Sequence, residues 1–363
     1  MAALLDKITE GHKRNRVTIS DMADALGLTK STVSRAMNGY PDISQATQNR
    51  VKRMAEKLSY RPLSHAQAIK TGRTRSLGLV LQLSDHDAQR PFLAEFLAGL
   101  SAGAHAEGWT LTVAASSSTE DMIETFRALL RDGKADGFIL PRAIRYDPRV
   151  TLLRDAAVPF VLFGRQDDET NCAWFDILGE EAMCDAVRRL HALGHRRIGY
   201  INGGTKYAYA HLREDGFRAG MQDVGLEVDD ALIIQDAVTS ADGAKAAAAL
   251  LDHPEPPTAI VCGVDFAALG AYQAAAARNL SVGRDLSIIG YDGIPEGAHA
   301  TPPLTTYQVD NKAAGERLSS LLIRRVRGEP LEDLRETALA SFVERGSIGP
   351  VPDTSNNTNK HET

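Results

Sequence analysis

The most constraining feature of this sequence is the stretch from Val17 to Leu58, which has the pattern of three short helices. Its first part carries apolar residues at the spacing that places them on one face of a helix, namely Ile19, Met22, Ala23 and Leu26. Ser20 is a candidate cap for the start of this helix, and Gly27 ends it.

A second helix is expected to begin after Thr29 and to end at Asn38-Gly39, because Thr is a common N-cap and Gly commonly follows a helix. A third helix, with Ser44 as its candidate cap, has apolar residues at helical spacing at Val51, Met54, Ala55 and Leu58. Two short helices around a Gly-containing turn, followed by a packing helix, make a helix-turn-helix.

The second helix has one polar face suited to DNA. Val33 and Met37 are expected to face the other helices. Lys30 leads the opposite face, which continues with Ser31, Ser34, Arg35 and Asn38. A helix fits the major groove, where Arg can bond guanine and Ser, Thr or Asn can bond bases or phosphates. The alternative is a solvated face on an ordinary three-helix domain.

The charge distribution favours the first interpretation. The whole chain of 363 residues has a net charge of −6, which does not suggest a nucleic-acid binder. Residues 1–75, however, hold 14 Lys and Arg against 6 Asp and Glu, a net charge of +8, whereas the remainder holds 27 against 41, a net charge of −14. A basic N-terminal module on an acidic body predicts DNA binding confined to that module.

Three segments of this module resemble the DNA-binding headpiece of the lactose-repressor/galactose-repressor family of bacterial transcriptional regulators. They are Val17-Thr-Ile-Ser-Asp-Met-Ala, Thr32-Val-Ser-Arg-Ala-Met-Asn-Gly and Leu58-Ser-Tyr-Arg-Pro62. By position, the resemblance implies that Lys30, Ser31 and Arg35 read bases. Phosphate contacts are implied for Thr18, Thr29, Ser34 and Asn38, and Ser20 and Thr32 complete the predicted DNA-binding set.

Two segments flank this module, which we assign to residues 17–61. Residues 1–16 precede the usual start of the family headpiece and are either a basic arm or a flexible tail. Residues 62–75 match a family hinge helix that wedges an apolar residue into the minor groove, and Ile69 occupies that position here. Ile is β-branched and stiffer than the usual Leu, and Leu63 stands where the family usually has Asn after the Pro, so the hinge contacts depart from the family pattern. A plain linker is the alternative.

From Ser76 onward, short apolar strands alternate with helices, which predicts an α/β fold of parallel sheets with helices on both faces. The length of this body favours two lobes. Three segments resemble the family core, which is similar to periplasmic sugar-binding proteins, and they begin at Leu193, Ile288 and Pro303. The resemblance implies an effector-binding and dimerisation domain over residues 76–348, while the Pro/Asn/Thr-rich residues 349–363 read as a disordered tail.

Ligands of open parallel sheets bind beyond the carboxyl ends of the strands, where Arg142, Arg165, Asp265 and Asp292 are expected. Arg213 matches the family Arg that grips the effector, and Asp292 matches its carboxylate partner. Arg can donate to sugar hydroxyls and Asp can accept from them. A structural ion pair is the alternative for these residues, and a core position is the alternative for Phe92, which could stack on a sugar.

Two departures from the family concern this site. The family Asp-Asn pair aligns with Leu178-Gly179, so Asp176 is a possible replacement, and Val264 stands where the family has Asn.

Other functions find little support in the sequence. It has no P-loop, no dinucleotide-binding glycine pattern, no His-Glu-x-x-His and no Gly-x-Ser-x-Gly, so we predict neither an enzyme nor a cofactor. Cys172, Cys184 and Cys262 form no CxxC and no obvious metal set, which predicts reduced thiols in a cytosolic protein. No apolar run is long enough to span a membrane, and no signal peptide is evident at the N-terminus.

The sequence therefore predicts a cytoplasmic homodimer that represses carbohydrate genes by binding a near-palindromic operator, with a sugar between its lobes as the effector. Within the same family, a purine, a sugar phosphate or a phosphocarrier protein could be the trigger instead. A sugar-binding module without DNA function is a further alternative, against which the headpiece argues.

Overall fold

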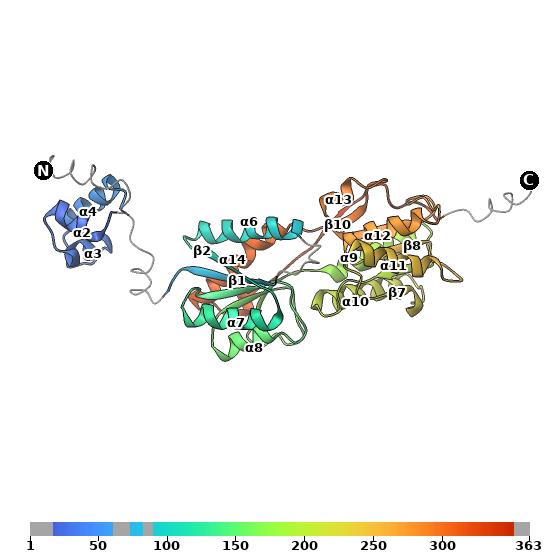
Figure 1. Cartoon of the computed structure of the whole chain (residues 1–363), viewed down its shortest axis with the longest axis horizontal. Coiled ribbons are helices and arrows are strands. Elements are labelled where there is room, and N and C mark those ends of the chain that lie inside the picture. Colours follow the sequence, from blue (N-terminus) through green and yellow to red (C-terminus); the bar gives the residue numbers. More distant parts are fainter. Residues whose placement is uncertain (1–16, 61–72, 83–89, 352–363) are drawn as a thin grey trace, which may run out of the picture. The chain divides into compact units, whose positions relative to one another are not determined.

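A computed structural model of the chain describes residues 17–60, 73–82 and 90–351 (Figure 1). The chain divides into two compact units between Thr74 and Arg75. The predicted N-terminal extension, Ile69 with most of the hinge, and residues 352–363 lie outside the described residues. None of the described helices is long and apolar enough to cross a membrane.

The first unit contains the three expected helices, α2 (Ile19–Leu26), α3 (Lys30–Met37) and α4 (Gln45–Lys57). Their buried faces form one core of Met22, Ala23, Leu26, Val33, Ala36, Val51 and Ala55. The cap of α2 corrects the expectation from the sequence. Thr18, not Ser20, accepts from the Asp21 backbone N–H, and Asp21 accepts from the Thr18 backbone N–H in return. Ser20 lies within the helix.

The second unit has two lobes, each built on a six-stranded sheet. In the first lobe the strand order is β11-β5-β4-β3-β1-β2, and all neighbouring strands are parallel. The bounds of these strands are β1 (Ser76–Gln82), β2 (Thr110–Ser116), β3 (Gly137–Leu140), β4 (Phe160–Phe163), β5 (Ala173–Ile177) and β11 (Arg335–Ala338).

Helices cover both faces of this first sheet (Figure 1). On one face, α6 (Arg90–Ala106) and α14 (Asn311–Arg327) pack against each other and against β1, as the cluster of Phe96, Leu318 and Leu79 shows. On the other face, α7 (Thr119–Arg131) and α8 (Pro148–Asp155) share a core with Val80 and Phe138. This arrangement confirms the predicted α/β layers.

The second lobe repeats the plan with the strand order β12-β10-β9-β8-β6-β7. Its one departure from the parallel prediction is the edge strand β12, which runs antiparallel to β10. The strand bounds are β6 (Ile198–Ile201), β7 (Ile233–Ile234), β8 (Ala259–Cys262), β9 (Ser287–Asp292), β10 (Thr305–Gln308) and β12 (Ser341–Val343).

The helices of this lobe also form two layers. The first layer is α9 (Gly179–Ala192) with α10 (Ala208–Asp223), and the second is α11 (Ser240–Leu251) with α12 (Asp265–Ala276). The short helices η1 (Asp230–Leu232) and α13 (Pro295–Ala298) also belong to this lobe, whereas η2 (Leu331–Leu334) packs in the core of the first lobe through Leu334.

The chain passes between the two lobes after β5, β10 and β11. The second lobe also includes the first residues of the segment that the sequence assigned to a disordered tail. The Gly349 carbonyl accepts from the His195 side chain at 3.0 Å, and the Val351 N–H donates to the Leu193 carbonyl at 3.0 Å. The folded body therefore extends at least to Val351.

Candidate functional site

The headpiece presents the predicted polar face of α3 to its surface. Val33 and Ala36 are buried on the inner side, whereas Lys30, Ser31 and Arg35 are exposed on the outer side. The residues expected to read bases therefore lie together on one helix, with none of them used in the core.

Several predicted phosphate contacts also have a structural role. Thr29 caps α3 by accepting from the Thr32 N–H at 3.1 Å, and the hydroxyls of these two residues lie 2.9 Å apart. The Asn38 side-chain amide donates to the Ser34 carbonyl at 2.6 Å and so closes the last turn. These bonds stabilise the two ends of the helix. One hydroxyl of the Thr29–Thr32 pair and the second N–H of the Asn38 amide can still donate to phosphate oxygens.

Two residues that the sequence missed flank Arg35. Its guanidinium forms an ion pair with Asp42 and lies 5.4 Å from the centroid of the Tyr40 ring. The buried Gln48 side chain fixes this turn by donating to the Tyr40 and Ile43 carbonyls, at 3.1 and 3.0 Å. Asp42 and Tyr40 follow α3 directly in the sequence. The spacing of apolar residues, however, cannot predict that the turn containing them folds back onto the helix.

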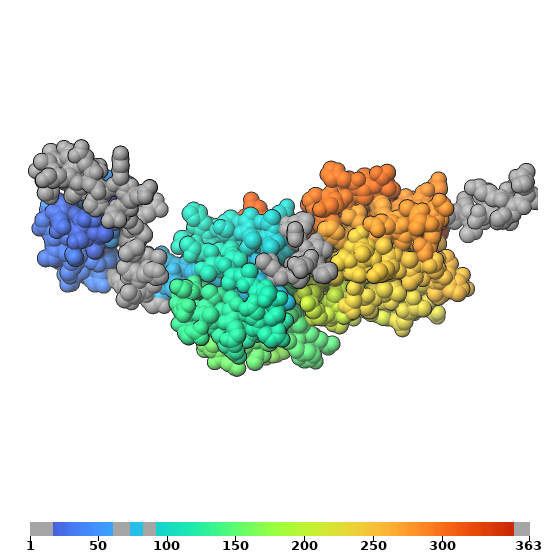
Figure 2. All heavy atoms as spheres, viewed as in Figure 1, coloured from blue at the N-terminus to red at the C-terminus, as the bar shows by residue number. Residues whose placement is uncertain are grey.

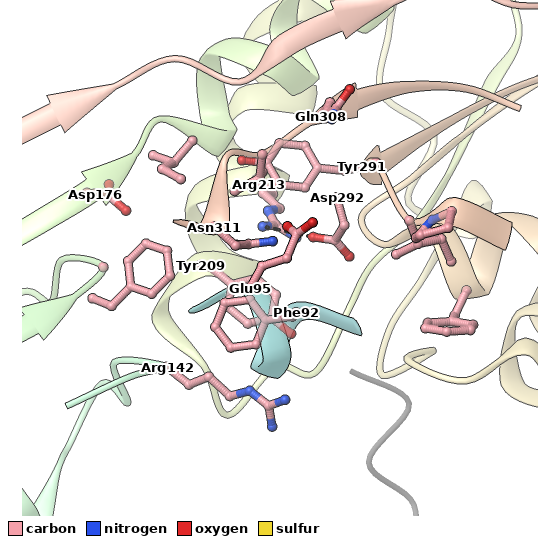
Figure 3. A pocket seen from close by; sticks show the side chains of 18 of the residues that line it. Phe92, Glu95, Arg142, Asp176, Tyr209, Arg213, Tyr291, Asp292, Gln308 and Asn311 are labelled. Atoms are coloured by element: carbon pink, nitrogen blue, oxygen red, sulfur yellow. Dashed lines mark ion pairs between the residues drawn. The ribbon is translucent and has the colours of Figure 1, made fainter. Parts of the chain in front are cut away.

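The body contains a cavity of about 380 Å³ lined by both lobes (Figure 3). Four of the predicted effector residues line it, and they are Phe92, Arg142, Arg213 and Asp292. The polar and aromatic lining residues that the sequence analysis did not place there are Glu95, Phe163, Tyr209, Phe266, Tyr291, Gln308, Asn311 and Arg345.

Arg213 lies in the second turn of α10 and is almost fully buried. Its guanidinium carbon is 3.8 Å from the centroid of the Tyr291 ring and 4.5 Å from that of Tyr209, and Nη1 donates to the Gly263 carbonyl at 2.5 Å. Nη2 is 4.0 Å from Asp292 Oδ1, which is too long for a direct hydrogen bond. The two charges thus face each other across a gap that a ligand hydroxyl can bridge.

Asp292 ends β9 with φ at 120°, a backbone conformation that a non-glycine residue rarely adopts. Arg142, also at the cavity, has φ at 54°. Burial raises the pKa of Asp292 to about 7, although the nearby Arg213 opposes this shift. A partly buried carboxylate on a strained backbone is more typical of a binding site than of a structural ion pair.

Asp265 and Arg165 do not line the cavity, contrary to the sequence prediction. Asp265 is fully buried at the start of α12, where it accepts from the Gly293 and Ile294 N–H groups and from the Thr306 hydroxyl, at 2.7 to 2.9 Å. It therefore supports the backbone that follows Asp292. Asp265 does follow a strand, as the sequence indicates, but the sequence could not show that its carboxylate already accepts these three hydrogen bonds within the protein.

Arg165 instead pairs with the carboxylates of Asp176 and Glu180. Asp176 lies near the end of β5 and lines the cavity. It therefore supplies a carboxylate to the cavity close to Leu178-Gly179, where the family has Asp-Asn. The Leu178-Gly179 pair starts α9, and a Cβ on Gly179 would lie only 2.9 Å from Cγ of Arg213. Glycine at this position lets Arg213 pack against the helix.

Two further observations concern which ligands the body can hold. The Gly203-Gly204-Thr205 loop lacks free donors at Thr205, because the Asp236 carboxylate accepts from both its N–H and its hydroxyl at 2.7 Å. Among the described residues, no group of three or more His, Cys, Asp or Glu is arranged to hold a metal ion.

Comparison with known proteins agrees with both parts of this geometry. Residues 18–63 match the family described as "Bacterial regulatory proteins, lacI family", and residues 187–348 match the "Periplasmic binding protein-like domain". The HTH-type transcriptional regulator AglR of Rhizobium meliloti (strain 1021) is 34% identical over 93% of this chain and 96% of the relative. The HTH-type transcriptional repressor CytR of Escherichia coli (strain K12) is 30% identical over 92% of this chain and 97% of the relative.

Solved structures give the same answer. A complex of the transcriptional regulator CelR with cellobiose is 29% identical, with a TM-score of 0.70 over 92% of this chain and 100% of that one. The lac repressor dimer bound to operator and an anti-inducer has a TM-score of 0.76 over 92% of this chain and 100% of that one, at 23% identity, and so supports the fold. The chain belongs to the lacI family of bacterial regulatory proteins and is a DNA-binding transcriptional regulator, not an enzyme.

Proposed function

We propose that this regulator is a cytoplasmic homodimer that represses genes of carbohydrate uptake or catabolism and that a neutral sugar or glycoside in the cavity is its effector. The observation that carries this proposal is the balanced charge of the cavity lining. The lining includes three guanidinium groups and three carboxylates, and these residues are Arg142, Arg213, Arg345, Glu95, Asp176 and Asp292.

A balanced lining suits a neutral ligand with many hydroxyls. Guanidinium groups donate to hydroxyl oxygens and carboxylates accept from hydroxyl hydrogens, so one ring can satisfy both. The rings of Phe92, Tyr209 and Tyr291 add apolar surface for the C–H faces of a sugar. The Tyr209 hydroxyl is buried without a hydrogen-bond partner among the described residues, which leaves it available to a ligand. The volume falls within the range of about 300–1,000 Å³ that is usual for ligand pockets.

The other candidate effectors make different demands. A sugar phosphate requires an excess of positive charge or free N–H groups, and Asp236 already occupies those of Thr205. A purine could pair with the side-chain amides of Asn311 and Gln308 and stack on Phe92, so it must be tested directly. A phosphocarrier protein would act on the outer surface and leave the cavity empty.

A thermal-shift screen of the full chain tests the effector class. The panel contains neutral mono- and disaccharides including cellobiose, the matching sugar phosphates, and purine nucleosides. We expect at least one neutral sugar to raise the melting temperature and to change the operator affinity measured by fluorescence anisotropy. A response confined to phosphorylated sugars or nucleosides would contradict the proposal.

The exposed polar face of α3 supports the part of the proposal that concerns DNA, in which the two headpieces of a dimer bind together. A two-fold dimer matches two half-sites of a near-palindromic operator, and Lys30, Ser31 and Arg35 would read each half. Effector binding is expected to change operator affinity by about 1–3 kcal/mol, the usual size of allosteric coupling. Sedimentation of the free protein and footprinting on DNA check the dimer and the half-site spacing. A monomer protecting one half-site would contradict this part of the proposal.

A further inference from the structure

Where the chain crosses between the two lobes of the body, a network of ion pairs connects them. Arg165 follows β4 in the first lobe, and its Nε donates to Asp176 Oδ2 at 2.6 Å. Its Nη2 pairs with Glu180, in the first turn of α9 in the second lobe. One planar guanidinium therefore joins Asp176, a carboxylate of the cavity in the first lobe, to Glu180 in the second lobe.

We propose that Arg165 is a positioning residue that couples the cavity carboxylate Asp176 to lobe closure through its ion pair with Glu180. The inference rests on the proposed function only in taking the cavity as the effector site. Arg165 does not itself line the cavity but bonds Asp176, which does, so its effect on a ligand is exerted through Asp176 and through the angle between the lobes.

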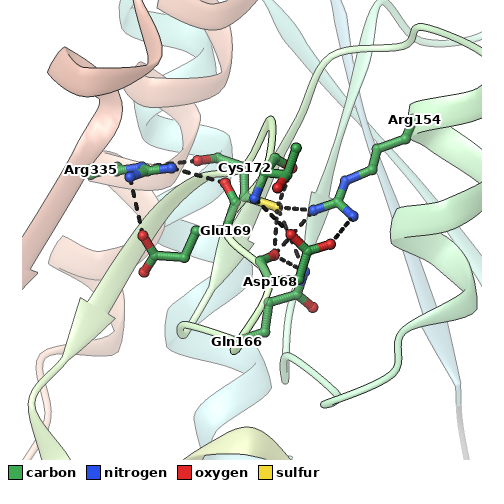
Figure 4. A network of polar contacts seen from close by, with 7 residues as sticks. Arg154, Gln166, Asp168, Glu169, Cys172 and Arg335 are labelled. Atoms are coloured by element: carbon green, nitrogen blue, oxygen red, sulfur yellow. Dashed lines mark hydrogen bonds and ion pairs between the residues drawn. The ribbon is translucent and has the colours of Figure 1, made fainter.

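The position of Arg165 is held from the first-lobe side. The residues that follow it, 166–172, form a loop anchored by two further arginines (Figure 4). Arg154 of α8 pairs with Asp168 at 2.5 Å and donates to Cys172 Sγ at 3.2 Å, and Arg335 of β11 donates to the Glu169 carbonyl at 2.9 Å. Because the loop is tied to two elements of the same lobe, Arg165 moves with that lobe.

Glu180 is held just as firmly on the second-lobe side. A Cβ on Gly216 of α10 would lie 2.1 Å from the Glu180 carbonyl oxygen, so the two helices touch backbone to backbone at this point. The neighbouring Gly179 packs on the side chain of Arg213, which also lines the cavity. Glu180 therefore moves with the second lobe, and a rotation that opens the lobes separates it from Arg165.

One oxygen of the ion pair between Arg165 and Glu180 opposes its formation. Oε2 of Glu180 is buried and has no hydrogen-bond partner among the described residues, so its desolvation opposes the ion pair. Opening the hinge returns that oxygen to water and breaks the contact with Arg165. A ligand that binds the closed or the open lobes with different affinity can therefore shift this contact.

A backbone contact elsewhere reports whether the lobes are together. The Ala208 N–H of the second lobe donates to the Ala143 carbonyl of the first lobe at 2.9 Å. Ala208 is the first residue of α10, so its N–H has no acceptor within the helix. Hydrogen exchange at this amide therefore measures opening of the lobes in the full chain without any ligand.

The test compares Glu180→Gln with Glu181→Gln. Both variants remove one negative charge from the first turn of α9, and Glu181 is exposed, so effects on the helix dipole are matched. We expect Glu180→Gln to accelerate exchange at Ala208 by about fivefold or more, whereas Glu181→Gln changes it by less than about twofold. Arg165→Lys, which loses the forked geometry, should also accelerate exchange at Ala208.

Amides of β8, in the core of the second lobe, distinguish a hinge effect from general loss of stability. If Glu180→Gln accelerates exchange at Ala208 and β8 alike, the ion pair is merely structural and the proposal is wrong. Equal rates at Ala208 in the two glutamine variants would also overturn it. Because this experiment contains no sugar, either result leaves the proposed effector class untouched.

Discussion

The headpiece and the body place their functional residues in opposite ways. In the headpiece, the proposed base readers Lys30, Ser31 and Arg35 sit on one turn and a half of α3. In the body, the cavity collects Phe92 from α6 and Arg213 from α10, with other residues from β5, β9 and α14. The first site depends on one local helix, whereas the second exists only when two lobes are folded and brought together.

This difference predicts how each site fails. A substitution on the exposed face of α3 removes a DNA contact and leaves the packing of the headpiece unchanged, because Val33 and Ala36 on the inner face carry that packing. A substitution in the cavity removes a ligand contact and also leaves a buried partner behind. The following predictions test that contrast, beginning with the largest expected effect.

Arg213→Ala should weaken effector binding by about fivefold to 150-fold, because it removes about 1–3 kcal/mol of hydrogen bonding and leaves Asp292 facing the ligand alone. Operator binding without effector should remain. Isothermal titration with the sugar found in the screen measures the first quantity, and anisotropy measures the second. If the variant only melts at a lower temperature and its folded fraction binds normally, Arg213 has a structural role instead.

Arg35→Ala should cost about 1–3 kcal/mol on the operator and relax base preference at one position of each half-site. The physical reason is the loss of a forked donor that can bond one guanine at two atoms. Arg53→Ala, an equal loss of charge on the exposed side of α4, is the control and should lower operator and random-sequence affinity alike. Unchanged discrimination in Arg35→Ala would contradict the assignment of α3.

Effector binding should depend on pH through Asp292, whose pKa is raised to about 7 by burial. The carboxylate accepts hydroxyl hydrogens better than the neutral acid, so affinity should fall as the pH drops from about 8 to about 6. Titrations at several pH values measure this slope. Asp292→Asn should bind more weakly and lose the slope, and a slope that persists in this variant would implicate another group.

The same group affects stability with the opposite sign. Its folded pKa lies above the value of 3.8 for a free aspartate, so between about pH 4 and pH 7 the folded protein holds more protons than the unfolded chain. Its contribution to the free energy of unfolding is therefore lost as the pH rises through this window. Melting curves of the wild type and of Asp292→Asn should diverge across it.

Thr18→Ala should destabilise α2 by about 1 kcal/mol, since it removes the hydroxyl that accepts from the Asp21 N–H, although the Thr18 backbone N–H can still donate to Asp21. The effect should be confined to the headpiece and visible as faster hydrogen exchange of α2 amides, while the body melts as before. Ser20→Ala, in the same helix without a capping bond, should change the exchange of these amides much less. Equal effects of the two substitutions would contradict the cap assignment.

Much of the architecture could be predicted from the sequence because it depends on local patterns. Periodic apolar residues located α2, α3 and α4, and alternating strands and helices indicated a two-lobed α/β body. Arg142 and Asp292 line the cavity, as expected from the rule that parallel strands deliver their carboxyl ends to one edge of a sheet, whereas Arg213 was indicated by the family resemblance and Phe92 by its aromatic ring. Where a strand such as β5 went unrecognised, its end residue Asp176 remained only a weak candidate.

The rest was decided by contacts between distant parts of the chain. Asp265 and Arg165 both follow strands, but backbone N–H groups and a hydroxyl occupy the first, and carboxylates from both lobes occupy the second. Likewise, the turn held by Gln48 brings Asp42 to Arg35. The sequence alone determines which side chains can form hydrogen bonds and near which element they lie. Only tertiary packing determines which of those bonds the protein satisfies internally and which remain for a ligand, because each buried polar group must find its partners in three dimensions.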